Sequence, residues 1–312
     1  MNSLNYFNHF LKSSEKLLII VAELPLISIA SVIQFLEHCY CPMIIEPLSQ
    51  LRQIPQLQSK MCDEASLNLS EFTHVLRLGA VPTTSIWRQL TRYSHLQVLS
   101  ISHIPFAGLP YGRILQIDYA QLRCGVNHEL PDQTWREHLT QNIAAHPNAE
   151  SSMIYHLSTI IPSGATVYLG NSSPIRLWAK YATYDHKLFN VFGSRGANGI
   201  DGQLSTFLGL ATHQSENWCI LGDLTALYDL SAPWIIPQLS DINLKIVIIH
   251  NGGGQIFSTI FPNHPELINA HAVDFDGWSN MWKLPVTTIT KSALLYKKRL
   301  NTQHVIVIKP TQ

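Results

Sequence analysis

Charged side chains are scarce in this chain, and neither sign prevails. Lys and Arg total 21, Asp and Glu total 21, and together they make up 13% of the 312 residues, against about 25% in typical soluble domains. A chain without excess positive charge has no field that attracts a phosphate backbone or an anionic membrane. We therefore expect no nucleic-acid and no membrane partner, and the low charge content suggests that an oligomer covers part of the surface.

The sequence also lacks a membrane span, a signal peptide and a disulfide framework. The longest apolar stretch, 17–36, is divided by Glu23 and Pro25 into pieces shorter than the roughly 20 residues that a span needs. The first residues have neither a basic start nor an apolar run, so we expect a cytoplasmic protein. The five cysteines are odd in number and scattered, and the close pair Cys39 and Cys41 is expected to serve packing.

Short apolar runs alternate with stretches of helical periodicity, such as Ile29, Val32, Ile33 and Leu36. The expected strands are 17–22, 43–45, 75–78, 97–101 and 114–117 in the first half, and 165–169, 189–192, 218–221, 244–249 and 304–308 in the second. This alternation predicts an α/β fold with two doubly wound, mostly parallel sheets. The continuous apolar character of the later runs predicts that helices cover both sheet faces.

The length predicts two domains, at roughly 150 residues each. Between His128 and Asn148 the pattern weakens into a polar stretch that contains Pro131 and Pro147. We therefore place a Rossmann-like domain at 1–130, a linker at 131–148 and a second domain at 149–312.

Four of the strands expected in the second domain end in glycine-rich or polar turns. These turns are 170–172, 193–196, 222–224 and 251–254. Ligands bind at the carboxyl ends of the strands in an open parallel sheet, so four such turns predict a binding site rather than ordinary loops. The Walker and G-x-G-x-x-G patterns are absent, which excludes the usual nucleotide cradles.

The most informative pair of residues in these turns is Asp223 and Asn251. They lie 28 residues apart, which is about the length of a βαβ crossover, so their strands should be near neighbours. A carboxylate, an amide oxygen and a backbone carbonyl form an oxygen set that suits Mg²⁺, and the glycines allow close approach to an anion. The pattern predicts a metal-bridged diphosphate. For Asp223 alone, a helix N-cap is the alternative.

Four segments of the second domain resemble a known family. They are 170–176, 194–202, 222–230 and 253–258, which read GNSSPIR, SRGANGIDG, GDLTALYDL and GGQIFS. The Gly-Asp, helix and Asn-Gly arrangement resembles the diphosphate-binding motif of thiamine diphosphate enzymes. More narrowly, the four segments resemble the 2-succinyl-5-enolpyruvyl-6-hydroxy-3-cyclohexene-1-carboxylate synthases of menaquinone biosynthesis. The first half resembles, more weakly, the central domain of that family.

The resemblance implies a transferase that uses thiamine diphosphate with Mg²⁺ or Mn²⁺ and joins decarboxylated 2-oxoglutarate to isochorismate. It implies that Asp223, Asn251 and the Gly253 carbonyl hold the metal. The cofactor-binding residues that it implies are Gly222, Asp223, Leu224, Asn251, Gly253, Gln255, Ile256 and Ile200, with Ile200 beneath the cofactor. The substrate-binding residues that it implies are Ser172, Arg176 and Arg195 for carboxylates, and Ile256, Phe257 and Ile260 for an apolar wall. Arg195 and Ile200 would be catalytic.

Some of these residues also have simpler interpretations. Arg176 and Arg195 could form surface salt bridges, and Ile200 could be an ordinary core residue. The 15 histidines are expected to be solvated or packed, although His250 directly precedes Asn251, where the family usually has a second asparagine.

The chain also departs from the family pattern. The family's N-terminal domain, which binds the aminopyrimidine ring and supplies a glutamate that activates the cofactor, has no counterpart in the match, and Glu46 lies too deep in the central-domain match to replace it. Ser85 stands where the family often has a basic residue that reaches the substrate. Pro233 and Pro237 should break the helix that follows Asp223.

Three hypotheses accommodate these departures. The chain is one subunit of a split synthase, completed by a pyrimidine-binding domain on another chain and by the oligomer in which the family forms its active sites. Alternatively, it is a decayed or repurposed relative that binds without catalysis, or the reading frame is truncated. The sequence leaves the substrate preference open, given Ser85.

Overall fold

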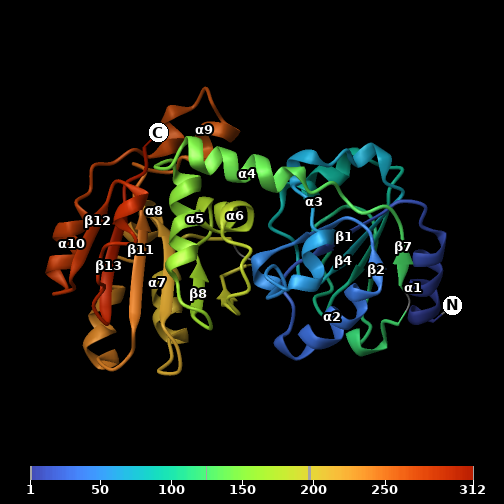
Figure 1. The fold of residues 1–312 in the computed structure, drawn as a ribbon, viewed down its shortest axis with the longest axis horizontal. Coiled ribbons are helices and arrows are strands. Elements are labelled where there is room, and N and C mark those ends of the chain that lie inside the picture. Colours follow the sequence, from blue (N-terminus) through green and yellow to red (C-terminus); the bar gives the residue numbers. More distant parts are fainter. Residues whose placement is uncertain (1, 124, 196–197, 312) are drawn as a thin grey trace. The chain divides into compact units, whose positions relative to one another are not determined.

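The computed structural model describes residues 2–123, 125–195 and 198–311. Cys124, together with Gly196 and Ala197 of the SRGANGIDG segment, lies outside these residues. The chain divides into two compact units, Met1–Leu139 and Thr140–Gln312, which we call unit 1 and unit 2 (Figure 1).

Unit 1 is built on a parallel sheet whose described strands follow the order β3-β1-β4-β5-β6. These strands are β1 (Leu17–Val21), β3 (Met43–Ile45), β4 (His74–Leu78), β5 (Gln97–Ile101) and β6 (Arg113–Leu115). The helices are α1 (Ser3–Ser13), α2 (Ile29–Glu37) and α3 (Ser85–Gln89). Two short strands, β2 (Cys39–Tyr40) and β7 (Val126–Asn127), pair separately, and the sequence did not predict them.

Unit 2 holds a second parallel sheet, whose described strands follow the order β12-β13-β11-β10-β8-β9. These strands are β8 (Thr166–Leu169), β9 (Asn190–Phe192), β10 (Asn217–Gly222), β11 (Leu244–Ile249), β12 (Val286–Ile289) and β13 (Gln303–Ile308). The α-helices are α5 (Glu150–Ile160), α6 (Ser173–Tyr181), α7 (Gln203–Leu210), α8 (Asp223–Tyr228), α9 (Ile256–Ile260) and α10 (Phe275–Met281). Two parallel, doubly wound sheets confirm the predicted fold class.

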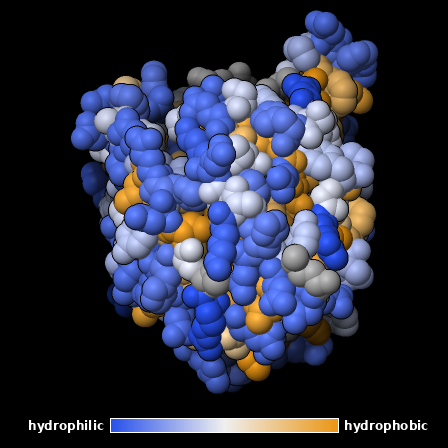
Figure 2. Space-filling view, turned by 90° about the vertical axis from the view of Figure 1, so that its right-hand side faces the viewer, coloured by the Kyte–Doolittle hydropathy of each residue, from blue (hydrophilic) through white to orange (hydrophobic). Residues whose placement is uncertain are grey.

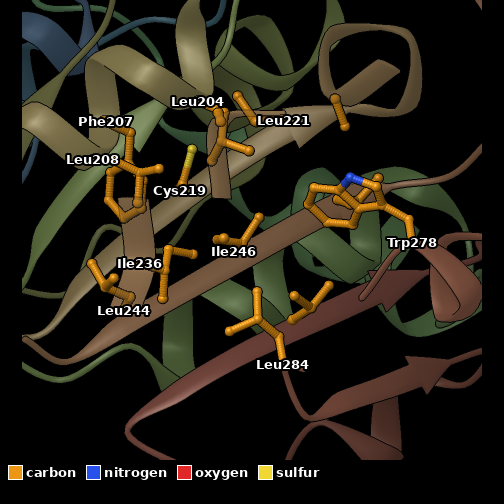
Figure 3. Close-up of a cluster of buried hydrophobic side chains, with 14 of the residues drawn as sticks. Leu204, Phe207, Leu208, Cys219, Leu221, Ile236, Leu244, Ile246, Trp278 and Leu284 are labelled. Atoms are coloured by element: carbon orange, nitrogen blue, oxygen red, sulfur yellow. The ribbon is translucent and has the colours of Figure 1, made fainter. Parts of the chain in front are cut away.

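One face of the unit 2 sheet carries a core that Figure 3 shows in close-up. Cys219 and Leu221 of β10 and Leu244 and Ile246 of β11 project to this face, because side chains alternate along a strand. Residues of α7, α10 and the 3₁₀ helix η8 (Ala232–Leu239) pack against them. Every residue of β11 is buried, including Lys245, so both faces of this strand are covered, as its largely apolar sequence predicted.

The polar stretch proposed as a linker contains a helix, α4 (Thr134–Ala145), and the division between the units falls within it. Two residues before the first residue of this helix, Asp132 accepts hydrogen bonds from the backbone N–H and the hydroxyl of Thr134. Ile143 is the buried residue of α4, and Trp135 and Leu139 are partly buried. These three residues stand four positions apart, a helical spacing that the surrounding polar sequence and the prolines on either side obscured.

The prolines after Asp223 act as predicted. The α-helix that begins at Asp223 ends at Tyr228, and the chain continues as η8, with Pro233 in its first turn and Pro237 inside it. A proline removes a backbone donor and crowds the preceding turn, so an uninterrupted α-helix is not available here.

Hydrophilic residues cover most of the face that Figure 2 displays, with hydrophobic residues in small groups between them. None of the helices in the described ranges combines the length and the apolar character that a membrane crossing requires. The thiols of Cys39 and Cys41 form no disulfide and are buried in the core, and burial raises the pKa of the Cys41 thiol. Both therefore serve packing, as expected.

The unit 2 core yields a stability prediction. Ile246 is 1% exposed, so Ile246→Ala leaves a cavity and should lower the free energy of unfolding by about 2–5 kcal/mol, whereas Ile246→Val should cost about 0.5–1.5 kcal/mol. Urea unfolding followed by circular dichroism measures both. Met281→Ala, at a residue 62% exposed, is the control, and an Ile246→Ala variant as stable as this control would contradict the packing described.

Candidate cation and diphosphate site

The order of the strands in unit 2 creates a crevice at one place on the sheet edge. From β8 the chain passes through α6 to β9 on one side, and later returns to β10 on the other side of β8. Such a reversal is where open α/β sheets bind ligands, at the carboxyl ends of the strands. The four predicted turns follow β8, β9, β10 and β11, which are adjacent and parallel, so the prediction that they share one edge is confirmed.

Asp223 lies at the centre of this edge, as the first residue of α8 directly after β10. Its side chain is buried. Oδ2 accepts hydrogen bonds from the backbone N–H groups of Gly252 at 2.8 Å and Gly253 at 3.0 Å, and Oδ1 accepts one from Leu224 at 2.8 Å. Gly222 is the N-cap of α8. The N-cap alternative for Asp223 is therefore wrong, and its carboxylate instead joins the turns after β10 and β11.

Two histidines flank the same carboxylate. His250 Nδ1 lies 3.2 Å and His271 Nε2 lies 3.3 Å from Asp223 Oδ2. The two imidazole rings stack with centroids 5.4 Å apart and an interplanar angle of 13°, and the edge of Phe275 packs against both. The expectation that the histidines are solvated or packed missed this contact. His250 carried a signal through its position beside Asn251, but His271 carried none.

The hydrogen bonds of His271 fix the position of its ring proton. The backbone N–H of Val273 donates to His271 Nδ1 at 3.2 Å, so in the neutral ring the proton is on Nε2 and faces Asp223. His250, His271 and Asp223 each place one ligand atom within 4.8 Å of the others, a spacing that would also suit a metal ion. A metal-binding imidazole instead donates from its other nitrogen, so His271 is not arranged as a metal ligand. Its Nε2 lies 3.3 Å from Asp223 Oδ2 but has no hydrogen-bond partner among the described residues, whereas His250 Nδ1 is hydrogen-bonded to the same oxygen at 3.2 Å.

Asn251 contacts a carboxylate that the sequence analysis also missed. Its Nδ2 donates to Oε2 of Glu150, the first residue of α5, at 3.1 Å, and its backbone carbonyl accepts from Gln255 Nε2 at 3.2 Å. Glu150 Oε1 is buried, with no hydrogen-bond partner among the described residues. Burial raises the pKa of Glu150, and the charge of Asp223 adds to this, against the lowering effect of the Asn251 hydrogen bond.

The turn after β11 requires glycine at Gly253. Its φ is +134°, and a Cβ there would lie 2.6 Å from the carbonyl oxygen of Ile268. Its own carbonyl accepts from the backbone N–H of Gln255 at 2.9 Å and retains a second lone pair. A Cβ on the next residue, Gly254, would lie 3.1 Å from Phe257 and 3.4 Å from Leu224, so the backbone is closely packed here.

Hydrogen bonds tie together the turns after β8 and β9. Arg195 Nη1 donates to Asn171 Oδ1 at 2.8 Å, and Asn171 Nδ2 donates to the carbonyl of Gly199 at 2.7 Å. Gln203 accepts from the Asn171 backbone N–H at 2.9 Å and donates to Gly199. Ile200, next to Gly199, is partly exposed. The buried Asn171 and Gln203 thus hold Arg195 and the segment that carries Ile200.

The remaining predicted residues lie on α6 and α9. Arg176 Nη1 donates to the carbonyl of Ser172 at 2.6 Å, and Ser172 itself has φ +72°, which is rare for a residue other than glycine. On α9, Ile256 is partly exposed, and Phe257 and Ile260 are 38% and 53% exposed. Hydrogen bonds join Asp223, Asn251, Gly253 and Gln255 into one group, and Arg195 with the Ile200 segment into another.

Comparison with solved structures places this fold in a class. A candidate thiamin diphosphate-dependent enzyme isolated from Mycobacterium smegmatis superposes with a TM-score of 0.67 at 16% identity, covering 99% of this chain and 63% of that one. The fold is thus one that occurs among thiamine diphosphate-dependent enzymes. No protein-family model matches the chain.

Sequence similarity specifies the family. The chain is 38% identical to the 2-succinyl-5-enolpyruvyl-6-hydroxy-3-cyclohexene-1-carboxylate synthase of Bdellovibrio bacteriovorus, over 86% of this chain and 54% of that protein. It is 31% identical to the Akkermansia muciniphila synthase, over 80% and 50%. The chain therefore belongs to this synthase family, as the sequence motifs indicated, and it spans about half the length of the curated relatives that it matches.

The buried carboxyl of Glu150 gives a prediction about pH. Its pKa is raised from the ordinary value of 4.5, so above that pH the folded chain binds more protons than the unfolded chain, and stability falls as the pH rises through the interval. In Glu150→Gln this loss should disappear, so the variant should lose less stability than the wild type between about pH 4.5 and 7.

Urea unfolding at several pH values measures this slope. Glu266 supplies a control of opposite sign, because a backbone hydrogen bond and His264 lower the pKa of its exposed carboxyl. Glu266→Gln should remove a contribution that increases stability as the pH rises. Identical slopes for the wild type and Glu150→Gln would contradict the burial of Glu150.

Proposed function

We propose that this chain is the thiamine diphosphate-binding part of a 2-succinyl-5-enolpyruvyl-6-hydroxy-3-cyclohexene-1-carboxylate synthase, which joins decarboxylated 2-oxoglutarate to isochorismate in menaquinone biosynthesis in the cytoplasm. Membership of the family supports this proposal. The observation that carries it is the buried Asp223 carboxylate at the sheet edge where the strand order reverses, on the strand adjacent to that of Asn251 and Gly253.

The residues at this edge fit a divalent cation and a diphosphate. Asp223 and Asn251 supply hard oxygen donors, the Gly253 carbonyl has a spare lone pair, and Mg²⁺ or Mn²⁺ prefers such ligands. The buried, unpartnered Oε1 of Glu150 adds a further acceptor, suited to a metal-bound water. Gly253 supplies the left-handed backbone and close approach that a diphosphate cradle uses.

Each predicted residue has a role in the proposed complex. Asp223, Asn251 and the Gly253 carbonyl would hold the cation. The other predicted cofactor-binding residues would line the cofactor; they are Gly222, Leu224, Gln255, Ile256 and Ile200. The bound cofactor supplies the carbon chemistry of decarboxylation and transfer, which protein side chains cannot perform. Arg195, Arg176 and Ser172 would orient substrate carboxylates, since a guanidinium matches a carboxylate with two parallel hydrogen bonds. Phe257 and Ile260, with Ile256, would keep water from the reacting centre.

The proposal assigns the other segments as the sequence suggested. Residues 1–130 would be the family's central domain, 131–148 a connection that is largely helical, and 149–312 the diphosphate-binding domain. A pyrimidine-binding domain, on a longer chain or on another subunit of an oligomer, would complete the active site.

Cofactor binding tests the cation site. Isothermal titration calorimetry of this chain with thiamine diphosphate should show binding that requires Mg²⁺ or Mn²⁺, because the cation neutralises the diphosphate. Asp223→Ala should weaken that binding at least tenfold, as loss of a metal ligand does. Asp241→Ala is the matched control, since this exposed aspartate lies before the opposite end of β11.

Turnover tests the synthase assignment. Alone, the chain should form no product from 2-oxoglutarate and isochorismate. With a polypeptide that carries the family's pyrimidine-binding domain, it should form product and release carbon dioxide. Metal-dependent cofactor binding that is never accompanied by turnover with any such polypeptide would instead favour the non-catalytic relative.

A further inference from the structure

Asp223 and Asn251, the two side chains proposed to hold the cation, also contact residues that lie outside the sequence motif. His250 and His271 face Asp223, and Glu150 faces Asn251. We propose that these three are positioning residues, which determine that Asp223 Oδ1 and Asn251 Oδ1 are the atoms presented to the cation. This inference rests on the proposed function and adds residues to the same site.

The two carboxylate oxygens of Asp223 have different surroundings. Around Oδ2 lie the backbone nitrogens of Gly252 and Gly253 at 2.8 and 3.0 Å and the ring nitrogens of His250 and His271 at 3.2 and 3.3 Å. A carboxylate oxygen has about two lone-pair positions, so Oδ2 has no room for a metal. Among the described residues, Oδ1 accepts one hydrogen bond, from Leu224, and so keeps a lone pair for the cation.

Neighbouring residues hold the imidazole rings of His250 and His271 in place. The rings stack on each other, the edge of Phe275 packs against both, and Val273 N–H holds His271 Nδ1. His250 Nδ1 is hydrogen-bonded to Asp223 Oδ2 and therefore carries the proton of the neutral ring, because a carboxylate can only accept. His271 carries its proton on Nε2, because its Nδ1 accepts from Val273, and this Nε2 lies 3.3 Å from Oδ2 without forming a hydrogen bond. The His250 hydrogen bond and the packing of the His271 ring together restrict rotation of the carboxylate about its Cβ–Cγ bond.

Glu150 performs the corresponding task for Asn251. A side-chain amide can bind a metal only through its oxygen, and the amide must therefore not flip. The Nδ2 group donates to Glu150 Oε2 at 3.1 Å, and only the nitrogen of the amide can donate to a carboxylate. With Nδ2 held by Glu150, Oδ1 is the atom that can face the cation.

Nitrogen NMR of the chain without cofactor tests the histidine assignment. For the neutral imidazole rings, ¹⁵N-histidine spectra should show the proton of His250 on Nδ1, the less common tautomer, and that of His271 on Nε2. Asp223→Leu, which removes the acceptor, should abolish the Nδ1 preference of His250. A His250 ring with its proton on Nε2 in the wild type would overturn the assignment, and this result does not depend on whether the chain binds any cofactor.

Cation binding tests whether these residues orient the oxygens that bind the metal. In the presence of thiamine diphosphate, Mn²⁺ binding followed by electron paramagnetic resonance should weaken about 10–100-fold in His271→Ala and Glu150→Ala, the range typical of residues that orient metal ligands. His250→Asn and Glu150→Gln keep a donor and an acceptor, respectively, so both should stay within about threefold of the wild type.

Two controls distinguish a loss of ligand orientation from a loss of folding. Circular dichroism should show that His271→Ala retains the wild-type spectrum, and Asp241→Ala should bind Mn²⁺ like the wild type. Wild-type affinity in His271→Ala and Glu150→Ala would overturn the proposal. If the wild type itself did not bind Mn²⁺ with thiamine diphosphate, the proposed function would fail, and the tautomer spectra would still decide whether the rings hold Asp223.

Discussion

A buried carboxylate at the end of β10 connects the parts of unit 2 on which the proposed function depends. Asp223 accepts hydrogen bonds from the backbone of its own helix start and from the glycine turn after β11. These hydrogen bonds join two turns that follow adjacent strands and satisfy both oxygens of the buried carboxylate. The carboxylate therefore both shapes the diphosphate turn and provides the charge that a cation needs.

The parallel sheet makes this arrangement possible, and most of it could be predicted. Strands such as β10 and β11 are buried on both faces, so their sequences are mostly apolar, apart from Asn217 and Lys245. These runs end at Gly222 and, after Ile249, at the polar pair His250 and Asn251. Because parallel strands place their carboxyl ends at one edge, the order of motifs along the chain was enough to bring Asp223 beside the glycine turn. The features that could be predicted were those that follow directly from the geometry of parallel strands and the connections between them.

The features that escaped prediction depend on contacts between segments far apart in sequence. Glu150 lies 101 residues from Asn251, and His271 reaches Asp223 from a loop without a motif. Helix α4 was missed for a different reason: its apolar residues Trp135, Leu139 and Ile143 do stand at helical spacing, but they are few within an otherwise polar segment. Strands β2 and β7 have two residues each, which is too short for an alternating pattern.

The account's central claim is that Asp223, Asn251 and Gly253 bind a divalent cation at the edge where the strand order reverses. The most direct measurement is the anomalous diffraction of crystals grown with Mn²⁺ and thiamine diphosphate. The account predicts a manganese peak within coordination distance, about 2.0–2.4 Å, of Asp223 Oδ1, Asn251 Oδ1 and the Gly253 carbonyl oxygen. A manganese ion bound elsewhere, with Asp223 still enclosed by its N–H donors and no cation beside it, would contradict the account.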